Sequence, residues 1–324
     1  MRRREFIAGL GATITGSIQT NAQELPPVPL VGYLDDGPAE GFVFRQVVLR
    51  EGLAELDYFE GCNVAIESHR GRLQDWASDL VDRGVAVLVA SGSVAAVLAA
   101  KAATTTIPIV FGFGADPVET GLVSSLDHPG GNITGITSMT MSMGSKRLGL
   151  LRDLLPRASR VAVLVDPNDD AIVVKSMIAD VRGAAIAIGR DMEVFYAGNV
   201  DDIDTAFAGL VGKRSEVLLV CPSSFFSSQR MQIAALAAQH RVPALYFERD
   251  FARAGGLMSY GPKIPEFYRQ LGNYAGRILS GQKPGDLPVS RATRLEFVIN
   301  LKTAKALGLT IPQTLLATAE EAIQ

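Results

Sequence analysis

Short apolar runs alternate along this chain with stretches of ten or more residues that are amphipathic or rich in alanine. The clearest example is residues 85–113, where the apolar runs Val85–Ala90 and Ile109–Phe113 flank the alanine-rich stretch Val94–Ala103. An uninterrupted apolar run indicates a strand buried on both faces, and an alanine-rich stretch favours a helix. The pattern therefore predicts a β-α-β unit in which the loop Ser91-Gly92-Ser93 follows the carboxyl end of the first strand.

The same alternation runs through the first half of the chain and starts again in the second half. In the first half it predicts strands at Leu30–Leu34, Val64–Ser68 and Ile133–Ile136, helices at Phe42–Leu56 and Leu73–Arg83, and a loop with a short helix at residues 116–126. In the second half it predicts strands at residues 161–165, 193–196, 217–221, 244–247, 257–260 and 295–299, and helices at residues 146–155, 171–189, 202–211, 228–240, 264–279 and 301–307. Repeated β-α units are typical of doubly wound parallel sheets. Because Thr137–Ser145 has no apolar periodicity, we expect it to cross from one α/β lobe to a second.

The first 22 residues have the composition of an export signal. Arg2-Arg3-Arg4 is a charged start, Phe6–Ile18 is mostly apolar or small, and Thr20-Asn21-Ala22 suits cleavage before Gln23. Such a segment is removed on export and takes no part in the fold. The string Arg3-Arg4-Glu5-Phe6-Ile7 also fits a twin-arginine signal, and the sequence leaves that route and ordinary secretion both open.

Composition and motifs narrow the classes of function. Without residues 1–22, which carry three Arg and one Glu, the formal charge falls from −3 to −5, and this opposes nucleic-acid binding. No apolar run reaches the roughly 18 residues that a membrane helix needs. Cys62 lies in a predicted turn and Cys221 ends a distant strand, so we expect two unpaired thiols. Zinc spacings, P-loops, GxGxxG, G-x-S-x-G and HExxH motifs are absent, so we expect no metal, no cofactor and no catalysis.

Polar residues and glycines follow several predicted strands at their carboxyl ends, where open parallel sheets bind ligands. The Ser91-Gly92-Ser93 loop opens a helix, so its hydroxyls and free N–H groups suit a carboxylate. An acidic residue at a neighbouring strand end suits an ammonium group, and serines beside an aromatic ring suit an amino acid or aromatic acid. The candidate ligand-binding residues are Asp35, Gly37, Ser91, Gly92, Ser93, Gly114, Asp116, Ser223, Ser224, Phe225, Phe247 and Glu248.

Several of these candidates also have a purely structural interpretation. Ser93 alone would cap the helix that follows it. Asp35 and Asp116 would be turn carboxylates, and Glu248 would belong to a solvated charge cluster. The residues by themselves leave both interpretations open.

Longer strings resemble a known family. They are Val31-Gly32-Tyr33, Glu60-Gly61, Asn63-Val64, Ile66-Glu67, residues 99–104 (AAKAAT), residues 107–111 (IPIVF), Asp116-Pro117-Val118, residues 121–132 (GLVSSLDHPGGN), Phe225-Phe226, residues 255–261 (GGLMSYG) and residues 298–312 (VINLKTAKALGLTIP). The chain is similar through them to the ABC-transporter substrate-binding proteins of the group that includes tryptophan and tyrosine uptake proteins. The resemblance spans the chain after the predicted signal, and the last string is specific.

The resemblance implies the type I periplasmic binding protein fold, with two doubly wound parallel-sheet lobes, three crossovers and a ligand cleft between the lobes. It implies that residues 27–140 plus 262–285 form one lobe and residues 146–259 plus 292–324 the other. The implied function is capture of a small carboxylated solute, an amino acid or aromatic acid, in the periplasm for delivery to a membrane ABC permease. We expect the protein to be a monomer. An exported enzyme on a Rossmann-like scaffold and a sensory ligand-binding protein are the alternatives that stay open.

Overall fold

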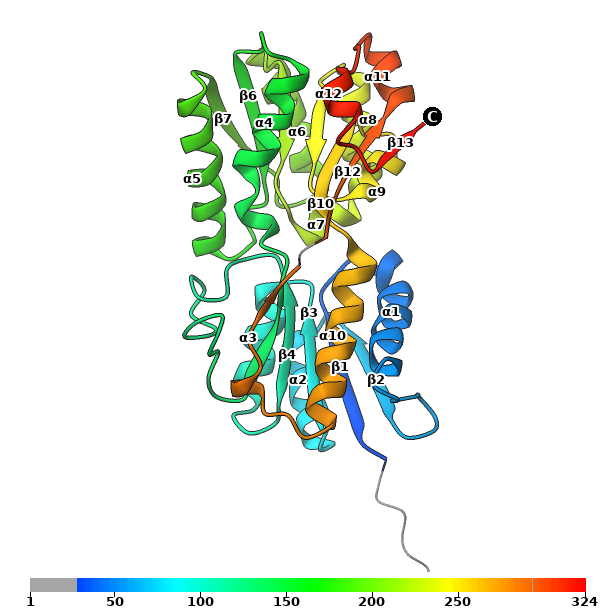
Figure 1. The fold of residues 1–324 in the computed structure, drawn as a ribbon. Helices are drawn as coiled ribbons and strands as arrows, with labels where there is room; N and C mark the ends of the chain where they lie inside the picture. Colours follow the sequence, from blue (N-terminus) through cyan, green and yellow to red (C-terminus); the bar gives the residue numbers. More distant parts are fainter. Residues whose placement is uncertain (1–27, 293) are drawn as a thin grey trace, which may run out of the picture.

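Two β-sheets form the centres of two lobes, and the chain passes between the lobes three times (Figure 1). The computed structural model describes residues 28–292 and 294–324. The predicted export signal, residues 1–22, lies outside the described residues. Within the described part, no helix combines the length and apolar character that crossing a bilayer requires.

The sheet of lobe 1 has six strands in the order β11-β5-β4-β3-β1-β2, and all neighbouring pairs are parallel. The strands are β1 (Leu30–Asp35), β2 (Ala65–Arg70), β3 (Val87–Ser91), β4 (Ile109–Phe113), β5 (Ile133–Thr137) and β11 (Ser290–Arg291). Val87 and Val89 of β3 pack with α1 (Phe42–Ala54) and α10 (Ile264–Leu279). Leu88 packs on the opposite face, with α2 (Leu73–Asp82) and α3 (Val94–Ala103). Both faces of the sheet are buried, which is why its central strands read as unbroken apolar runs.

The sheet of lobe 2 has seven strands in the order β13-β12-β10-β9-β8-β6-β7. The strands are β6 (Arg160–Val165), β7 (Asp191–Tyr196), β8 (Val217–Val220), β9 (Ala244–Tyr246), β10 (Met258–Pro262), β12 (Leu295–Asn300) and β13 (Glu321–Ile323). The helices are α4 (Gly144–Leu154), α5 (Ala171–Ala187), α6 (Val200–Gly212), α7 (Ser224–Ser228), α8 (Arg230–Gln239), α9 (Arg249–Arg253), α11 (Leu301–Leu307) and α12 (Gln313–Leu316). The predicted fold class, two doubly wound α/β lobes, is confirmed, although β10 and β12 pair antiparallel.

The three connections between the lobes are short. β5 leads through residues 138–143, which include the 3-10 turn η2 (Thr140–Ser142), into α4 of lobe 2. β10 leads through Lys263 directly into α10, which returns to lobe 1, and β11 leads back to β12. The second connection therefore places the start of α10 between the two lobes (Figure 1).

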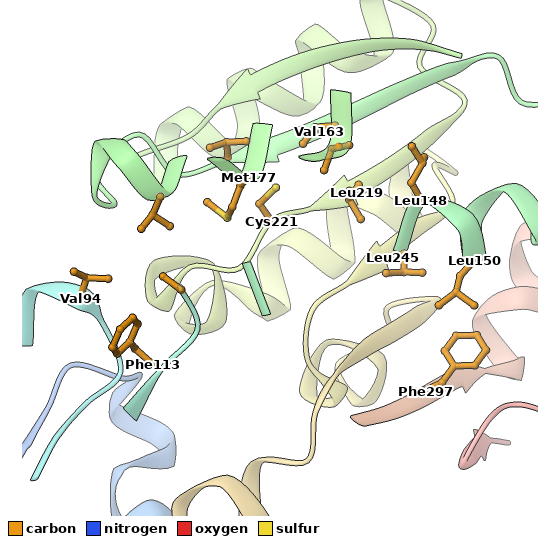
Figure 2. Packing of buried hydrophobic residues seen from close by; sticks show 14 of the residues in the cluster. Val94, Phe113, Leu148, Leu150, Val163, Met177, Leu219, Cys221, Leu245 and Phe297 are labelled. Atoms are coloured by element: carbon orange, nitrogen blue, oxygen red, sulfur yellow. The ribbon is translucent and has the colours of Figure 1, made fainter. Parts of the chain in front are cut away.

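Buried side chains continue from one lobe into the other. Val94 and Phe113 of lobe 1 belong to the same hydrophobic cluster as Met177 and Cys221 of lobe 2, and the two pairs face each other across the junction (Figure 2). Burial of apolar surface at this junction favours the closed arrangement of the lobes. The two lobes are in direct contact in this structure, and this arrangement is called the closed form below.

Some local predictions differ from the structure. Residues 116–126 contain turns and no helix, because the Asp116 carboxylate accepts from the N–H of Val118 and caps a turn. The helix expected at residues 228–240 is confirmed as α8 (Arg230–Gln239), whereas α7, α9 and β13 were not expected. Cys62 and Cys221 are unpaired thiols, as predicted, with Cys62 exposed and Cys221 buried.

Candidate ligand-binding cleft

A cavity of about 130 Å³ lies between the lobes. It is lined by the loops that follow β1, β3 and β4 in lobe 1 and β8 and β9 in lobe 2, together with the first and second crossovers. Parallel strands of one sheet end at the same edge, so loops that are distant in sequence meet there. The cavity therefore lies where the predicted strand-end loops converge.

Glycines and hydroxyl groups form the polar part of the lobe 1 wall, and Phe113, Phe267 and Tyr268 form its apolar part. Gly92 has a φ of 98°, and a Cβ at this position would lie 2.6 Å from the backbone nitrogen of Gly37. Only glycine allows the two loops to approach this closely. The hydroxyls of Ser138 and Thr140, on the first crossover, hydrogen-bond to each other at the same wall. This wall offers polar groups with little bulk, which suits a polar end of a ligand.

The lobe 2 wall begins with two serines of different roles. Ser223 caps α7, because its Oγ accepts from the N–H of Phe225, and the same hydroxyl donates to Asp166 Oδ2 at 2.7 Å. Ser224 Oγ reaches across the cleft and donates to the carbonyl oxygen of Gly92 at 3.3 Å. The second bond joins the two lobes directly and belongs to the closed form.

Glu248, two residues after β9, is the one acidic residue among those that line the cavity, and the same lining contains no lysine or arginine. Burial raises the pKa of its carboxyl group to about 7, and the hydrogen bond with Ser227 acts in the opposite direction. A positively charged ligand group beside Glu248 would favour the ionised form and make a charge-assisted hydrogen bond. The lining therefore combines one carboxyl group, from lobe 2, with hydroxyls from lobe 2 and the first crossover and with glycine backbone from lobe 1.

A comparison with protein-family models decides the class of this two-lobed protein. The model described as "ABC transporter substrate binding protein" matches residues 45–323. The chain belongs to this family.

Individual relatives agree with this assignment. A tyrosine-binding protein of Clostridioides difficile (strain R20291) is 30% identical over 266 residues, which are 80% of this chain and 75% of that protein. The crystal structure of a conserved domain protein from Vibrio cholerae is 25% identical, with a TM-score of 0.84 over 91% of this chain and 99% of the other. The structure of an ABC domain from Streptococcus pneumonia in complex with L-Trp is 22% identical, with a TM-score of 0.82 over the same shares. The last likeness concerns the fold alone.

The cavity of this substrate-binding protein brings together seven of the twelve candidate residues. They are Gly37, Gly92, Gly114, Ser223, Ser224, Phe247 and Glu248. Their contact with a ligand stays a prediction, and the other five candidates have different surroundings.

Asp35 and Ser91 form a buried network beneath the lobe 1 wall. Ser91 Oγ donates to Asp35 Oδ1 at 2.8 Å, and Tyr33 Oη donates to the same oxygen at 3.1 Å. Arg45 of α1 pairs with the other oxygen, its Nε lying 3.1 Å from Asp35 Oδ2. Burial raises the pKa of Tyr33, so the phenol stays a donor. In this closed form the Asp35 charge is matched by Arg45 inside lobe 1.

Ser93, Asp116 and Phe225 make local structural contacts within their own lobes. Ser93 Oγ accepts from the N–H of Ala96 as the cap of α3. Asp116 caps a turn, and Phe225 packs against the hydrophobic cluster of lobe 2. None of the three lines the cavity.

Several lining residues were missed by sequence reasoning. Ser138 and Thr140 lie in the stretch that was assigned only to the crossover, and Phe267 and Tyr268 lie in the apolar stripe of α10. The signal that could have found them is the topology itself, because every crossover of a two-lobed protein passes the edge of the cleft.

A second crevice between the lobes is rich in carboxylates. Its volume is about 250 Å³, and it shares Gly92 and Ser224 with the cavity. Asp36 of lobe 1 and Asp169 of lobe 2 both line it. Burial, together with the neighbouring aspartates, raises the pKa of Asp169 to about 7, and its Oδ2 has no hydrogen-bond partner in the described part of the chain. Closing the lobes therefore brings acidic groups together.

One side-chain cluster has the donor types of a metal site. Oxygen and nitrogen atoms of Glu67, His69 and Asp79 lie within 4.8 Å of one another. However, Arg83 pairs with both carboxylates at 2.9 Å, to Glu67 through Nη1 and to Asp79 through Nε. The guanidinium already balances the negative charge that a cation would need.

Proposed function

We propose that this protein is the exported solute receptor of an ABC uptake transporter, and that its ligand is an amino acid with an aromatic side chain. The observation that carries the proposal is the asymmetry of the cavity. The one carboxyl group of the lining, that of Glu248, comes from lobe 2, whereas the lining glycines belong to lobe 1 and the hydroxyls of Ser138 and Thr140 to the first crossover. An amino-acid ammonium group would pair with Glu248, and the α-carboxylate would accept hydrogen bonds from the lobe 1 wall.

The size of the cavity bears on the ligand's side chain. A volume of about 130 Å³ is below the roughly 300–1,000 Å³ of common ligand pockets. A larger opening of about 500 Å³ adjoins it and shares Glu248 and Tyr268. Phe44 and Ile264 line this opening beside Tyr268, so an aromatic ring could pack there while the charged groups of the ligand stay in the cavity. The rest of the lining is largely charged and comprises Glu40, Arg45, Arg230, Arg249, Asp250 and Arg253 besides Glu248. The tyrosine-binding relative and the L-Trp complex make aromatic amino acids the first ligands to test.

Capture would follow from closure. A ligand that contacts both lobes binds the closed form in preference to the open one, and this difference shifts the population toward closure. The closed, monomeric receptor would then deliver the ligand to a membrane permease from the periplasm. A cleaved export signal at residues 1–22, by the twin-arginine route or by ordinary secretion, would bring the chain there. Nothing in this scheme requires catalysis by the receptor.

Thermal-shift and calorimetric titrations with a panel of L-amino acids test the proposal. L-Tyrosine and L-tryptophan should raise the Tm, because a ligand at 100 times its Kd stabilises the bound state by about 2.7 kcal/mol. Tyramine, which lacks the carboxylate, and 3-(4-hydroxyphenyl)propionate, which lacks the ammonium group, should both bind more weakly. A panel in which no amino acid shifts the Tm refutes the proposed ligand class.

A further inference from the structure

Arg147 of α4 is buried to an unusual degree for a charged residue, with 1% of its surface exposed. No carboxylate of residues 28–292 and 294–324 forms an ion pair with it, and its Nη2 has no hydrogen-bond partner there. Asp180 is near, but its Oδ2 accepts from the N–H of Ser145. Burial lowers the pKa of Arg147 to about 10, so the guanidinium is still charged at neutral pH. A buried cation without an ion-pair partner destabilises the folded state. Its presence therefore points to a function for the hydrogen bonds that Arg147 does make.

Those contacts join two different crossovers. Arg147 Nη1 donates to the carbonyl oxygen of Thr140 at 2.8 Å, and Thr140 lies on the first crossover. Arg147 Nε donates to the carbonyl oxygen of Tyr260 at 2.9 Å, on the strand that leads into the second crossover. A guanidinium is a rigid planar fork, so it holds two acceptors at a fixed separation.

The first crossover is also part of the cavity wall. Thr140 lines the cavity, and the N–H of the next residue, Met141, donates to the carbonyl oxygen of Gly114 in lobe 1 at 3.1 Å. This short segment is thus bonded to lobe 1 on one side and to Arg147 of lobe 2 on the other. Opening the lobes must rotate the backbone of both crossovers, which Arg147 connects.

We propose that Arg147 is a positioning residue for ligand capture, which couples the first and second crossovers so that they rotate together and Thr140 keeps its place in the closed cavity. The inference rests on the proposed function for its effect on affinity. Its effect on the relative motion of the lobes is independent of which ligand binds.

The test compares Arg147→Lys and Arg147→Gln with the control Arg190→Gln. Lysine keeps the charge but cannot span both carbonyls, and glutamine removes the charge. Arg190 is a matched control because it is 7% exposed and donates to a backbone carbonyl, that of Leu155, within lobe 2. If the glutamine variant fails to fold, the lysine variant still carries the test.

Spin labels report the motion of the lobes in the full chain. One label goes on the natural exposed thiol of Cys62 in lobe 1, and the other on Lys175→Cys, an exposed position of α5 in lobe 2. Cys221 is buried at the junction of the lobes, which opening would uncover, so every labelled protein, the wild-type reference included, also carries Cys221→Ala. Pulsed electron spin resonance then gives the distribution of distances between the labels, and calorimetry gives the Kd for L-tyrosine.

Both Arg147 variants should broaden the ligand-free distance distribution and raise the Kd about tenfold, within the range of conformational coupling. The Arg190 variant should leave the distances and the Kd as in the wild type, whatever its Tm. A wild-type distance distribution in Arg147→Lys, or an equal change in the control, overturns the inference. If no amino acid binds even to the wild type, the proposed ligand class fails, and the ligand-free distances still decide the role of Arg147.

Discussion

The contact between α1 and α10 makes a sharp prediction about Gly272, which lies on α10 one turn from the cavity-lining Phe267 and Tyr268. Backbone touches backbone at this contact. A Cβ added to Gly272 would lie 2.0 Å from the carbonyl oxygen of Leu49, and a Cβ added to Gly52 on the facing helix would lie 1.9 Å from that of Arg269. Ordinary contacts of a Cβ begin at 3.4 Å, so Gly272→Ala must push the helices apart by more than an ångström.

The expected change in stability is the difference of two opposing effects. Alanine improves the helix propensity of α10 by about 1 kcal/mol. Overpacking of a tight interface costs about 1–3 kcal/mol or more, and this overlap, with backbone that cannot rotate away, belongs at the upper end. Gly272→Ala should therefore lower the free energy of unfolding by about 2 kcal/mol. Gly183→Ala on α5 is the control, because no atom other than the nearby backbone of its own helix lies within 4 Å of the added Cβ, and it should gain about 0.5–1 kcal/mol.

Urea denaturation of both variants and the wild type, followed by circular dichroism, measures these free energies. The two lobes can unfold in separate transitions, so the transition of lobe 1 is identified first by the fluorescence of Trp76, the one tryptophan of the chain. If Gly272→Ala is as stable as Gly183→Ala, the close approach of α1 and α10 does not exist in solution, and the placement of α10 at the cavity loses its support.

Three further predictions concern charge. Glu248→Gln should raise the Kd for L-tyrosine at pH 8 by roughly ten- to a hundredfold, since a hydrogen bond to a charged group contributes about 1.5–3 kcal/mol. The Kd of 3-(4-hydroxyphenyl)propionate, which lacks the ammonium group, should not change. Equal losses of affinity for both ligands in calorimetry would contradict this prediction. In the closed form burial is the main cause that raises the pKa of Asp169 to about 7, followed by Asp166 and then by Asp36 of lobe 1. Opening the lobes would expose Asp169 and separate it from Asp36, so we expect closure to take up a proton and to weaken as pH rises toward 7. The Kd of the wild type, divided by the Kd of Asp169→Asn, should therefore increase with pH. The increase should be at most about tenfold per pH unit, begin near about pH 5 and level off above about pH 7. A ratio that does not change with pH would disprove the linkage. Arg45→Met should lower the free energy of unfolding by about 3–5 kcal/mol by leaving Asp35 unpaired, and Asp35→Asn should recover part of this loss in the double variant; strictly additive losses would show that the two side chains do not interact.

The regular part of the fold could be predicted because it depends on local patterns. The helix Val94–Ala103 has the predicted bounds, and so do the strand Ile109–Phe113 and the helix Ile264–Leu279. β13 could not be predicted, since three residues show no period and the strand exists only through its pairing with β12. The antiparallel pairing of β10 with β12 is likewise a tertiary event, because strand direction leaves no trace in an apolar run.

The candidate site, too, could be predicted only in part. Its loops could be predicted, because parallel strands end at one edge of a sheet. Strand parity decides only which residues at the strand ends point away from the cavity, and the loops that follow bring other residues to it. Asp35 and Ser91 are partners in the register of β1 and β3, and their side chains lie on the face that Tyr33 shares with α1 and α10. One and two residues later, Gly92 and Gly37 reach the cavity. Parity could have been counted from Tyr33, had the face covered by α10 been known.

The crossovers contribute cavity-lining residues whose backbone must move when the lobes open. Thr140 and Pro262, on different crossovers, both line the cavity, and so does Ile264 at the start of α10. These residues must change their backbone angles when the lobes separate, so their distances to a bound solute differ between the open and closed forms. A ligand shifts a conformational equilibrium only through such differences in contact. Because the moving segments themselves line the cavity, a solute bound there would contact them, and recognition and closure would draw on the same contacts. Arg147 lies where those segments enter lobe 2.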